Sequence, residues 1–206
     1  MTFNVDVPAL ANTIGADIPD IEENFAVLGP YSTIWVPAEA MTPLSTNGAE
    51  AGVNEYATND IMMNYLAFDG GATAEWASFS LPMPENWNLL TILAKFYWAP
   101  GSADASESDT VEWKLGGQAI ANDGALDVAL ADAGEVISDA VTAGKNADLH
   151  ITGVTPAITI GGTPALAKLV HFKLSRNVAG TDDMTEDAWL FGAWLQYKIS
   201  EEVAEW

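Results

Sequence analysis

Apolar and polar side chains alternate along the C-terminal part of the chain. From Trp189 to Ile199, one parity carries large apolar side chains and the other carries smaller or more polar ones, among them Gln196 and Lys198. Period-two alternation over this length is typical of a half-buried strand. We therefore expect a strand over 189–199 whose core side consists of Trp189, Phe191, Ala193, Leu195, Tyr197 and Ile199.

The same alternation recurs along the body of the chain. Clear strands are predicted over 75–81, 90–98, 110–115 and 166–174, and weaker ones over 33–36, 61–68, 148–155 and 157–160. The stretch 125–143 is rich in Ala and Asp but is cut by glycines, so we expect mostly loop there, with at most a short helix or strand. Many short strands separated by Gly, Pro, Asn and Asp turns predict an all-β fold, an antiparallel β-sandwich or jelly roll over residues 31–206.

Residues 1–30 differ from this body because Pro8, Pro19 and Pro30 interrupt any long element. We expect an extended N-terminal arm with one short helical turn near Asp20–Phe25. Its apolar side chains predict that it lies on its own domain or on a neighbouring subunit. The contact candidates are Phe3, Val5, Val7, Leu10, Ile14, Ile18, Ile21 and Phe25.

Composition narrows the classes of partner. The 206 residues include 7 Lys and Arg against 29 Asp and Glu, a formal charge of −22, and no cation precedes Lys95. Binding to a phosphate backbone or an anionic membrane needs clustered cations, so neither nucleic acid nor membrane is an expected partner. No apolar run is long enough for a transmembrane helix, and the N-terminus lacks the basic region of a signal peptide. With no cysteine, disulfides and zinc–thiolate sites are excluded.

No catalytic constellation stands out. The two histidines, His150 and His171, lie in predicted strands, and there is no G-x-S-x-G motif. Carboxylates are abundant, so their number alone does not indicate a glycosidase. The densest cluster, on the loop before the last strand, is a weak candidate for calcium, with a solvated acidic loop as the default: Asp182, Asp183, Glu186 and Asp187. We expect no enzyme activity and no cofactor.

Eight tryptophans leave two interpretations open. Large rings suit a sandwich core or a subunit interface, and they also suit platforms on which sugars stack. Trp194 lies on the more polar side of the last predicted strand, with Leu190. We therefore expect Trp194 to make a subunit contact.

An ordered series of short motifs runs through residues 31–199. It comprises WVPAEAM (35–41), NDIM (59–62), FDG (68–70), EWASF (75–79), MPENW (83–87), KFYW (95–98), DGALDVA (123–129), DLHIT (148–152), VHFKLSR (170–176) and DAWLFG (187–192). The series resembles a family of virion structural proteins of tailed bacteriophages. The resemblance implies a non-enzymatic β-sandwich on the virion.

Within that family, a small acidic β-protein resembles a capsid decoration, or cement, protein. This resemblance implies an outer-surface location, a homotrimer, and the major capsid protein as partner, with the arm bridging subunits. The alternative is a host-recognition or carbohydrate-binding module of a head or tail fibre, which the tryptophan content favours. A glycoside hydrolase is a third hypothesis, supported only by the carboxylates.

Overall fold

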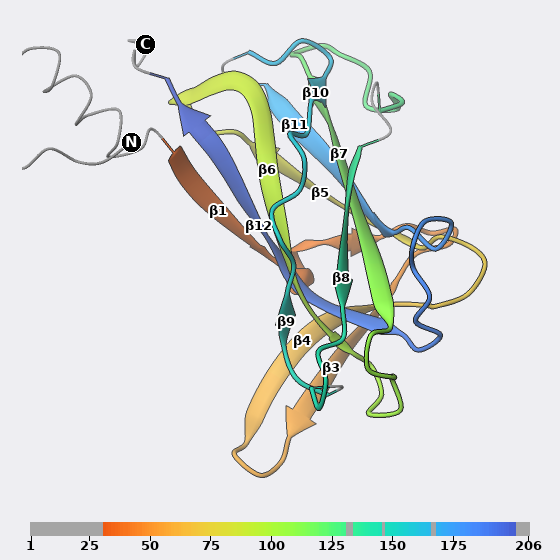
Figure 1. The fold of residues 1–206 in the computed structure, drawn as a ribbon. Helices are drawn as coiled ribbons and strands as arrows, with labels where there is room; N and C mark the ends of the chain where they lie inside the picture. Colours follow the sequence, from red (N-terminus) through yellow and green to blue (C-terminus); the bar gives the residue numbers. More distant parts are fainter. Residues whose placement is uncertain (1–30, 131–133, 146, 166–167, 201–206) are drawn as a thin grey trace, which may run out of the picture.

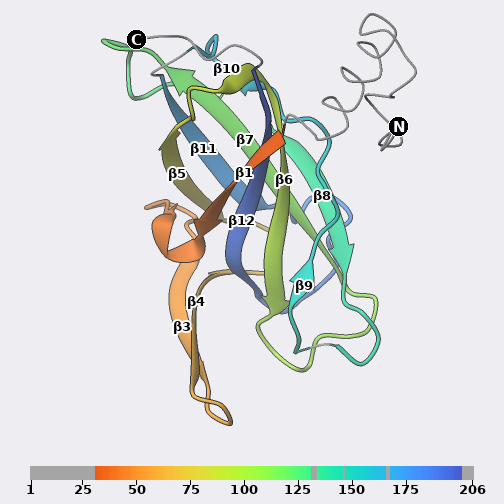
Figure 2. The same cartoon turned by 90° about the vertical axis from the view of Figure 1, so that its left-hand side faces the viewer.

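A computed structural model describes residues 31–130, 134–145, 147–165 and 168–200, which form two facing β-sheets (Figures 1 and 2). The first sheet has the order β3-β4-β12-β6-β9, and β1 also pairs with β12. Its strands are β1 (Tyr31–Pro37), β3 (Glu50–Tyr56), β4 (Ile61–Phe68), β6 (Trp87–Pro100), β9 (His150–Ile151) and β12 (Ala188–Ile199).

The second sheet has the order β10-β7-β11-β5-β2, and β8 also pairs with β7. Its strands are β2 (Thr42–Pro43), β5 (Trp76–Pro82), β7 (Thr110–Ile120), β8 (Glu135–Ala140), β10 (Ile160–Gly161) and β11 (Leu169–Arg176). All strand pairs are antiparallel except β10 with β7. The expected all-β sandwich is confirmed. In the part of the chain that the structure describes, the one helical element is the single turn η1 (Ala38–Ala40), and no helix could cross a membrane.

One hydrophobic core fills the space between the sheets. From β6, the alternate residues Ile92 to Trp98 face inward and are fully buried, and β11 presents Val170, Phe172 and Leu174 to them. These inward faces are the predicted ones. Trp113 of β7 meets Phe68 edge-on with ring centroids 5.2 Å apart, which closes the core at one end.

A β-bulge changes the predicted faces of β12. Leu190 pairs with Trp98 of β6 and Gly192 pairs with Tyr97, so Phe191 is an extra residue without a partner on β6. The strand also changes neighbours here, from β4 before the bulge to β1 after it. Ala193, Leu195 and Tyr197 face the core as predicted. The inward placement predicted for Trp189 was wrong, because the inward residues before the bulge are Ala188 and Leu190.

Other predictions differ in extent. β4 spans the predicted 61–68. The predicted 148–155 contains only the two-residue strand β9, and the predicted 157–160 reaches only the first residue of the two-residue strand β10. The described residues of the glycine-cut stretch 125–143 include one strand, β8. β3 was not predicted, and with β4 it forms a hairpin that projects from one end of the sandwich (Figures 1 and 2). The predicted arm, residues 1–30, lies outside the described residues.

Candidate functional site

Three aromatic side chains gather on the outer side of the first sheet. Trp35 of β1 pairs with Trp194 of β12, and the ring of Tyr97 meets Trp35 edge-on, with centroids 4.9 Å apart. Trp35 is 47% exposed, whereas rings between the two sheets, such as those of Trp98 and Trp113, are fully buried. We call this surface, made of Trp35, Tyr97 and Trp194, the aromatic face.

Backbone and polar groups fix the aromatic face in place. Gly192 pairs with both Pro37 and Tyr97, and a Cβ placed on it would lie 2.4 Å from the Trp35 ring, so the indole lies directly over this glycine. Lys95 pairs with Trp194 and holds its Nζ 5.7 Å from the ring centre. Gln196 and Thr33 form the next cross-strand pair and add hydrogen-bonding groups beside the rings.

A second aromatic pair lies on the same side of the sheet. Trp189 stacks on Tyr65 of β4 with centroids 4.1 Å apart and an interplanar angle of 14°. Trp189 and Trp194 are five positions apart and would face opposite sides of a regular strand. The bulge at Phe191 therefore gives both tryptophans the same outer side.

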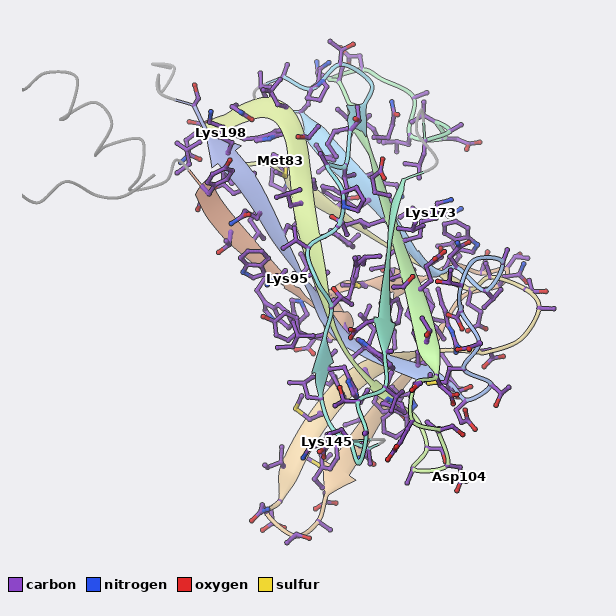
Figure 3. The ribbon with its side chains drawn as sticks, viewed as in Figure 1. Met83, Lys95, Asp104, Lys145, Lys173 and Lys198 are labelled. Atoms are coloured by element: carbon purple, nitrogen blue, oxygen red, sulfur yellow. The ribbon has the colours of Figure 1, made fainter. Side chains whose placement is uncertain are left out.

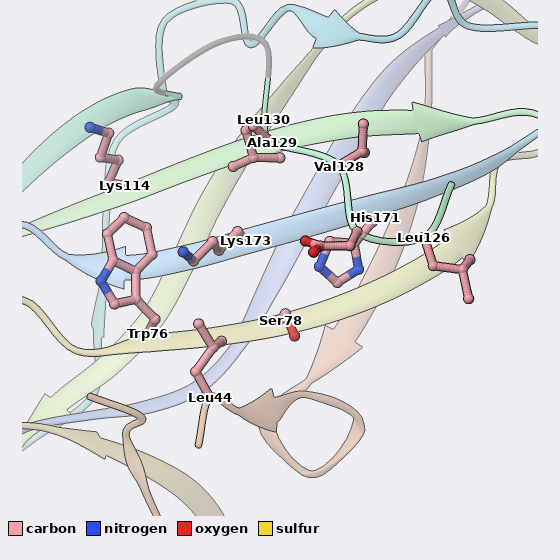
Figure 4. Close-up of a pocket in the computed structure, with 11 residues that line it drawn as sticks. Leu44, Trp76, Ser78, Lys114, Leu126, Val128, Ala129, Leu130, His171 and Lys173 are labelled. Atoms are coloured by element: carbon pink, nitrogen blue, oxygen red, sulfur yellow. The ribbon is translucent and has the colours of Figure 1, made fainter. Parts of the chain in front are cut away.

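The outer side of the second sheet carries a separate pocket of about 520 Å³ (Figure 4). Its floor consists of outward side chains of three neighbouring strands: Trp76 and Ser78 from β5, His171 and Lys173 from β11, and Lys114 from β7. The loop residues 126–130 form its far wall. We call it the loop pocket.

The polar groups of the loop pocket are held by their neighbours. The Nζ of Lys173 lies 4.2 Å from the Trp76 ring centre, a close cation–π contact. His171 Nδ1 is hydrogen-bonded to Ser80 Oγ at 2.9 Å. Burial, and secondarily the charge of Lys173, lower the pKa of His171, so its imidazole is neutral at pH 7. Trp76 thus belongs to a partly cationic site rather than to the core.

The acidic loop before β12 folds onto a buried arginine. Arg176 is completely buried and forms a bidentate ion pair with Asp182, in which Nε donates to Oδ2 at 2.8 Å and Nη2 donates to Oδ1 at 2.7 Å. Its remaining N–H groups donate to the carbonyl oxygens of Phe68, Met184 and Glu186, so the whole guanidinium is satisfied. Asp182 also accepts from the backbone N–H of Glu112 at 3.0 Å. The guanidinium thus supplies the positive charge that Asp182 faces.

The other calcium candidates are dispersed. Asp183 accepts a hydrogen bond from the backbone N–H of Thr110 at 2.6 Å. Asp187 instead faces Asp69, Glu75 and Glu50, and partial burial together with the charge of Asp69 raises the pKa of both Asp187 and Glu75. Within the described ranges, no group of three or more His, Asp or Glu side chains is arranged to hold a metal ion.

The remaining predicted residues divide between core and surface. Trp87, Trp98 and Trp113 are fully buried, which is the core role expected for large rings. His150 is buried, and its ring stacks on Trp98 with centroids 4.9 Å apart. Trp194, expected at a subunit contact, lies on the aromatic face. The eight contact candidates of residues 1–30 lie outside the described residues.

The meeting of Trp35, Tyr97 and Trp194 on one face was not predicted from the sequence. Trp35 was considered a sugar platform only as one of eight tryptophans, and Tyr97 was identified only as a member of a predicted strand. The β1–β12–β6 order that unites them follows from long-range pairing. The alternation of the aliphatic Ile34 and Val36 with Thr33 and Trp35 was the available signal in the sequence, and in the structure Thr33 and Trp35 are the exposed pair. The loop pocket had no such signal, since it is closed by a segment without regular structure.

No family model matches the chain, and no curated protein matches it in sequence. Among solved structures, it is similar to an arabinose-bound GH51 α-L-arabinofuranosidase (TM-score 0.43, 11% identity), covering 82% of this chain but only 25% of that one. It is also similar to a carbohydrate-binding module CBM36 in complex with calcium and xylotriose (TM-score 0.39, 18% identity, 79% of this chain and 97% of that one). A third is a CBM36-1 domain of a multidomain xylanase from the hindgut metagenome of Trinervitermes trinervoides (TM-score 0.45, 8% identity, 80% and 96%). The structural neighbours thus include carbohydrate-binding modules.

Proposed function

We propose that the chain is a non-catalytic module that binds a glycan on the aromatic face. The observation that carries this proposal is the 47% exposed Trp35, which pairs across strands with Trp194 and meets the ring of Tyr97 edge-on. A single exposed aromatic ring is common on protein surfaces and needs no explanation. Several rings gathered on one exposed face are typical of a binding surface.

The chemistry of the aromatic face suits sugars. The apolar C–H face of a pyranose ring can lie against an indole, which offers a large apolar area with little conformational entropy to lose. Lys95, Gln196 and Thr33 border the rings and can bond to sugar hydroxyls. An open, flat surface of this kind suits a chain of several sugars rather than one buried monosaccharide.

Single substitutions test the proposal. Glycan-array screening followed by calorimetry should identify a bound oligosaccharide, and Trp35→Ala should weaken its binding at least tenfold because it removes the stacking platform. Trp194→Ala should do the same. Tyr56→Ala is the matched control, because Tyr56 is an exposed aromatic at the tip of the β3–β4 hairpin, away from the aromatic face. Unchanged binding by a folded Trp35→Ala protein would contradict the proposal.

The capsid decoration role stays a prediction based on the resemblance of the sequence. It predicts a trimer in light scattering, and binding to capsids of the major capsid protein that is lost when residues 1–30 are deleted. A truncated protein that still decorates capsids would refute the role given to the arm. A virion location and glycan binding are compatible, since the alternative role, a host-recognition module of a head or tail fibre, also includes carbohydrate binding.

A further inference from the structure

We propose that the loop pocket is a second binding site, which takes a carboxylate carried on a sugar ring, as in a uronic acid residue. This site lies on the second sheet and is independent of the aromatic face on the first. The proposal rests on the cations that gather there, on the way they are held, and on the apolar walls around them.

The cations of this chain are few, and the loop pocket holds two of the seven. Arg176 is buried on Asp182, Lys145 pairs with Asp148 at 2.9 Å, and Lys168 donates to the carbonyl oxygens of Gly162 and Thr163. Figure 3 shows Lys145 and Lys198 at opposite ends of the molecule, both away from Lys173. Two cations in one pocket therefore stand out against a formal charge of −22.

Lys114 and Lys173 both line the loop pocket, from adjacent strands. Lys173 pairs with Gly116 and Ser175 pairs with Lys114, so the two lysines are diagonal neighbours on the outer side of the sheet. Side chains in this relation lie within reach of one anion. Within the described ranges, no carboxylate forms an ion pair with either lysine. The contact with Trp76 restrains the Lys173 ammonium and leaves its charge uncompensated.

Among the described residues that line the loop pocket, one carboxylate is present, that of Asp127. It lies on the exposed wall rather than on the sheet floor. The described lining residues thus carry two ammonium groups against one carboxylate, and His171 is neutral at pH 7, so together they are net positive. A concave positive site in a negative protein concentrates anions locally. Asp127 should compete with such an anion for the lysines.

The apolar walls of the loop pocket favour an anion that also has an apolar surface. The loop pocket is also lined by apolar side chains, those of Leu44, Trp76, Leu126, Val128 and Leu130. Inorganic phosphate or sulfate would leave these apolar walls unused, whereas a sugar ring that carries a carboxylate contacts both. The volume of about 520 Å³ falls within the range of about 300–1,000 Å³ usual for small-ligand pockets.

The experiment compares an acidic trisaccharide with its neutral counterpart. Calorimetry of the full chain in about 20 mM salt should detect binding of trigalacturonate and not of galactotriose or inorganic phosphate, and about 200 mM salt should weaken it. The double variant Lys114→Gln/Lys173→Gln should reduce the affinity for trigalacturonate at least tenfold. Lys198→Gln is the control, because it removes the same kind of charge from the exposed end of β12.

Asp127→Asn supplies a test that loss of folding cannot imitate. Removing the competing carboxylate should strengthen trigalacturonate binding about two- to fivefold. The same titrations are repeated in the Trp35→Ala background, which lacks the platform of the aromatic face, so that trigalacturonate binding that persists there belongs to the loop pocket and the two proposals are tested separately. Absence of binding, equal binding of galactotriose, equal binding of phosphate, or weaker binding by Asp127→Asn would each overturn the proposal.

Discussion

At the scale of single residues, Gly192 supports the aromatic face. Its backbone lies under the Trp35 ring, and an added Cβ would also lie 2.7 Å from the carbonyl oxygen of Val36. Gly192→Ala should therefore force the ring outward and destabilise the fold by about 1–3 kcal/mol, as overpacking does. Denaturant unfolding measures the loss. Gly71→Ala is the matched control, because nothing lies within 4 Å of a Cβ there, and equal losses in the two variants would contradict the explanation.

Asp187 belongs to a group of mutually repelling carboxyl groups. Partial burial, the carboxyl of Asp69 and the charge of Glu50 raise its pKa, so the folded state binds this proton more tightly than the unfolded state does. Protonation therefore adds stability as pH falls through the raised pKa, and ionisation costs stability at neutral pH. Asp187→Asn should raise the melting temperature at pH 7 by roughly 1–2 °C.

The pH dependence of that gain distinguishes local repulsion from net charge. The difference between Asp187→Asn and the parent should disappear near pH 3, where carboxyl groups are protonated in both proteins. Asp60→Asn removes the same charge from the exposed β3–β4 turn, at a φ of 54° that Asn also adopts. Melting curves at pH 7 that show equal gains in both variants would contradict a local cause.

At the scale of elements, the loop that joins β11 to β12 depends on one ion pair. Asp182→Asn leaves the buried Arg176 without its counter-charge, and such uncompensated charges cost about 3–5 kcal/mol. Asp183→Asn is its natural control. It removes the same charge one residue later, and its Oδ1 still accepts from Thr110. A loss in Asp182→Asn no larger than in Asp183→Asn, measured by urea unfolding, would show that Arg176 does not anchor the loop.

The strands also differ in how well the sequence predicts them. Strands β6 and β11 were predictable because their alternation is regular and two-sided. β3, with the sequence EAGVNEY, was not, because its pairing with β4 stabilises a segment with little apolar character of its own. The bulge at Phe191 reverses the faces of β12, and no local pattern marks it. The same holds for the aromatic face. Each of its aromatic residues can be read from the sequence, but their proximity depends on the register between strands.

At the scale of the whole molecule, the negative charge acts against compactness. A formal charge of −22 repels itself across the acidic surface, and added ions screen that repulsion. The melting temperature should therefore rise when sodium chloride increases from about 10 mM to about 300 mM, over which the screening length falls several-fold. The buried Arg176–Asp182 pair is shielded from these ions, so its contribution should not offset the gain.

The same salt should act with opposite sign on the loop pocket, where the attraction between two ammonium groups and an anion is screened. Melting temperature and trigalacturonate affinity, measured in one salt series, should therefore move in opposite directions. Ammonium sulfate would also strengthen apolar burial, so sodium chloride is the suitable salt. A melting temperature that falls with sodium chloride would mean that surface attractions, rather than net repulsion, dominate. An affinity that does not fall would mean that the lysines do not hold the anion.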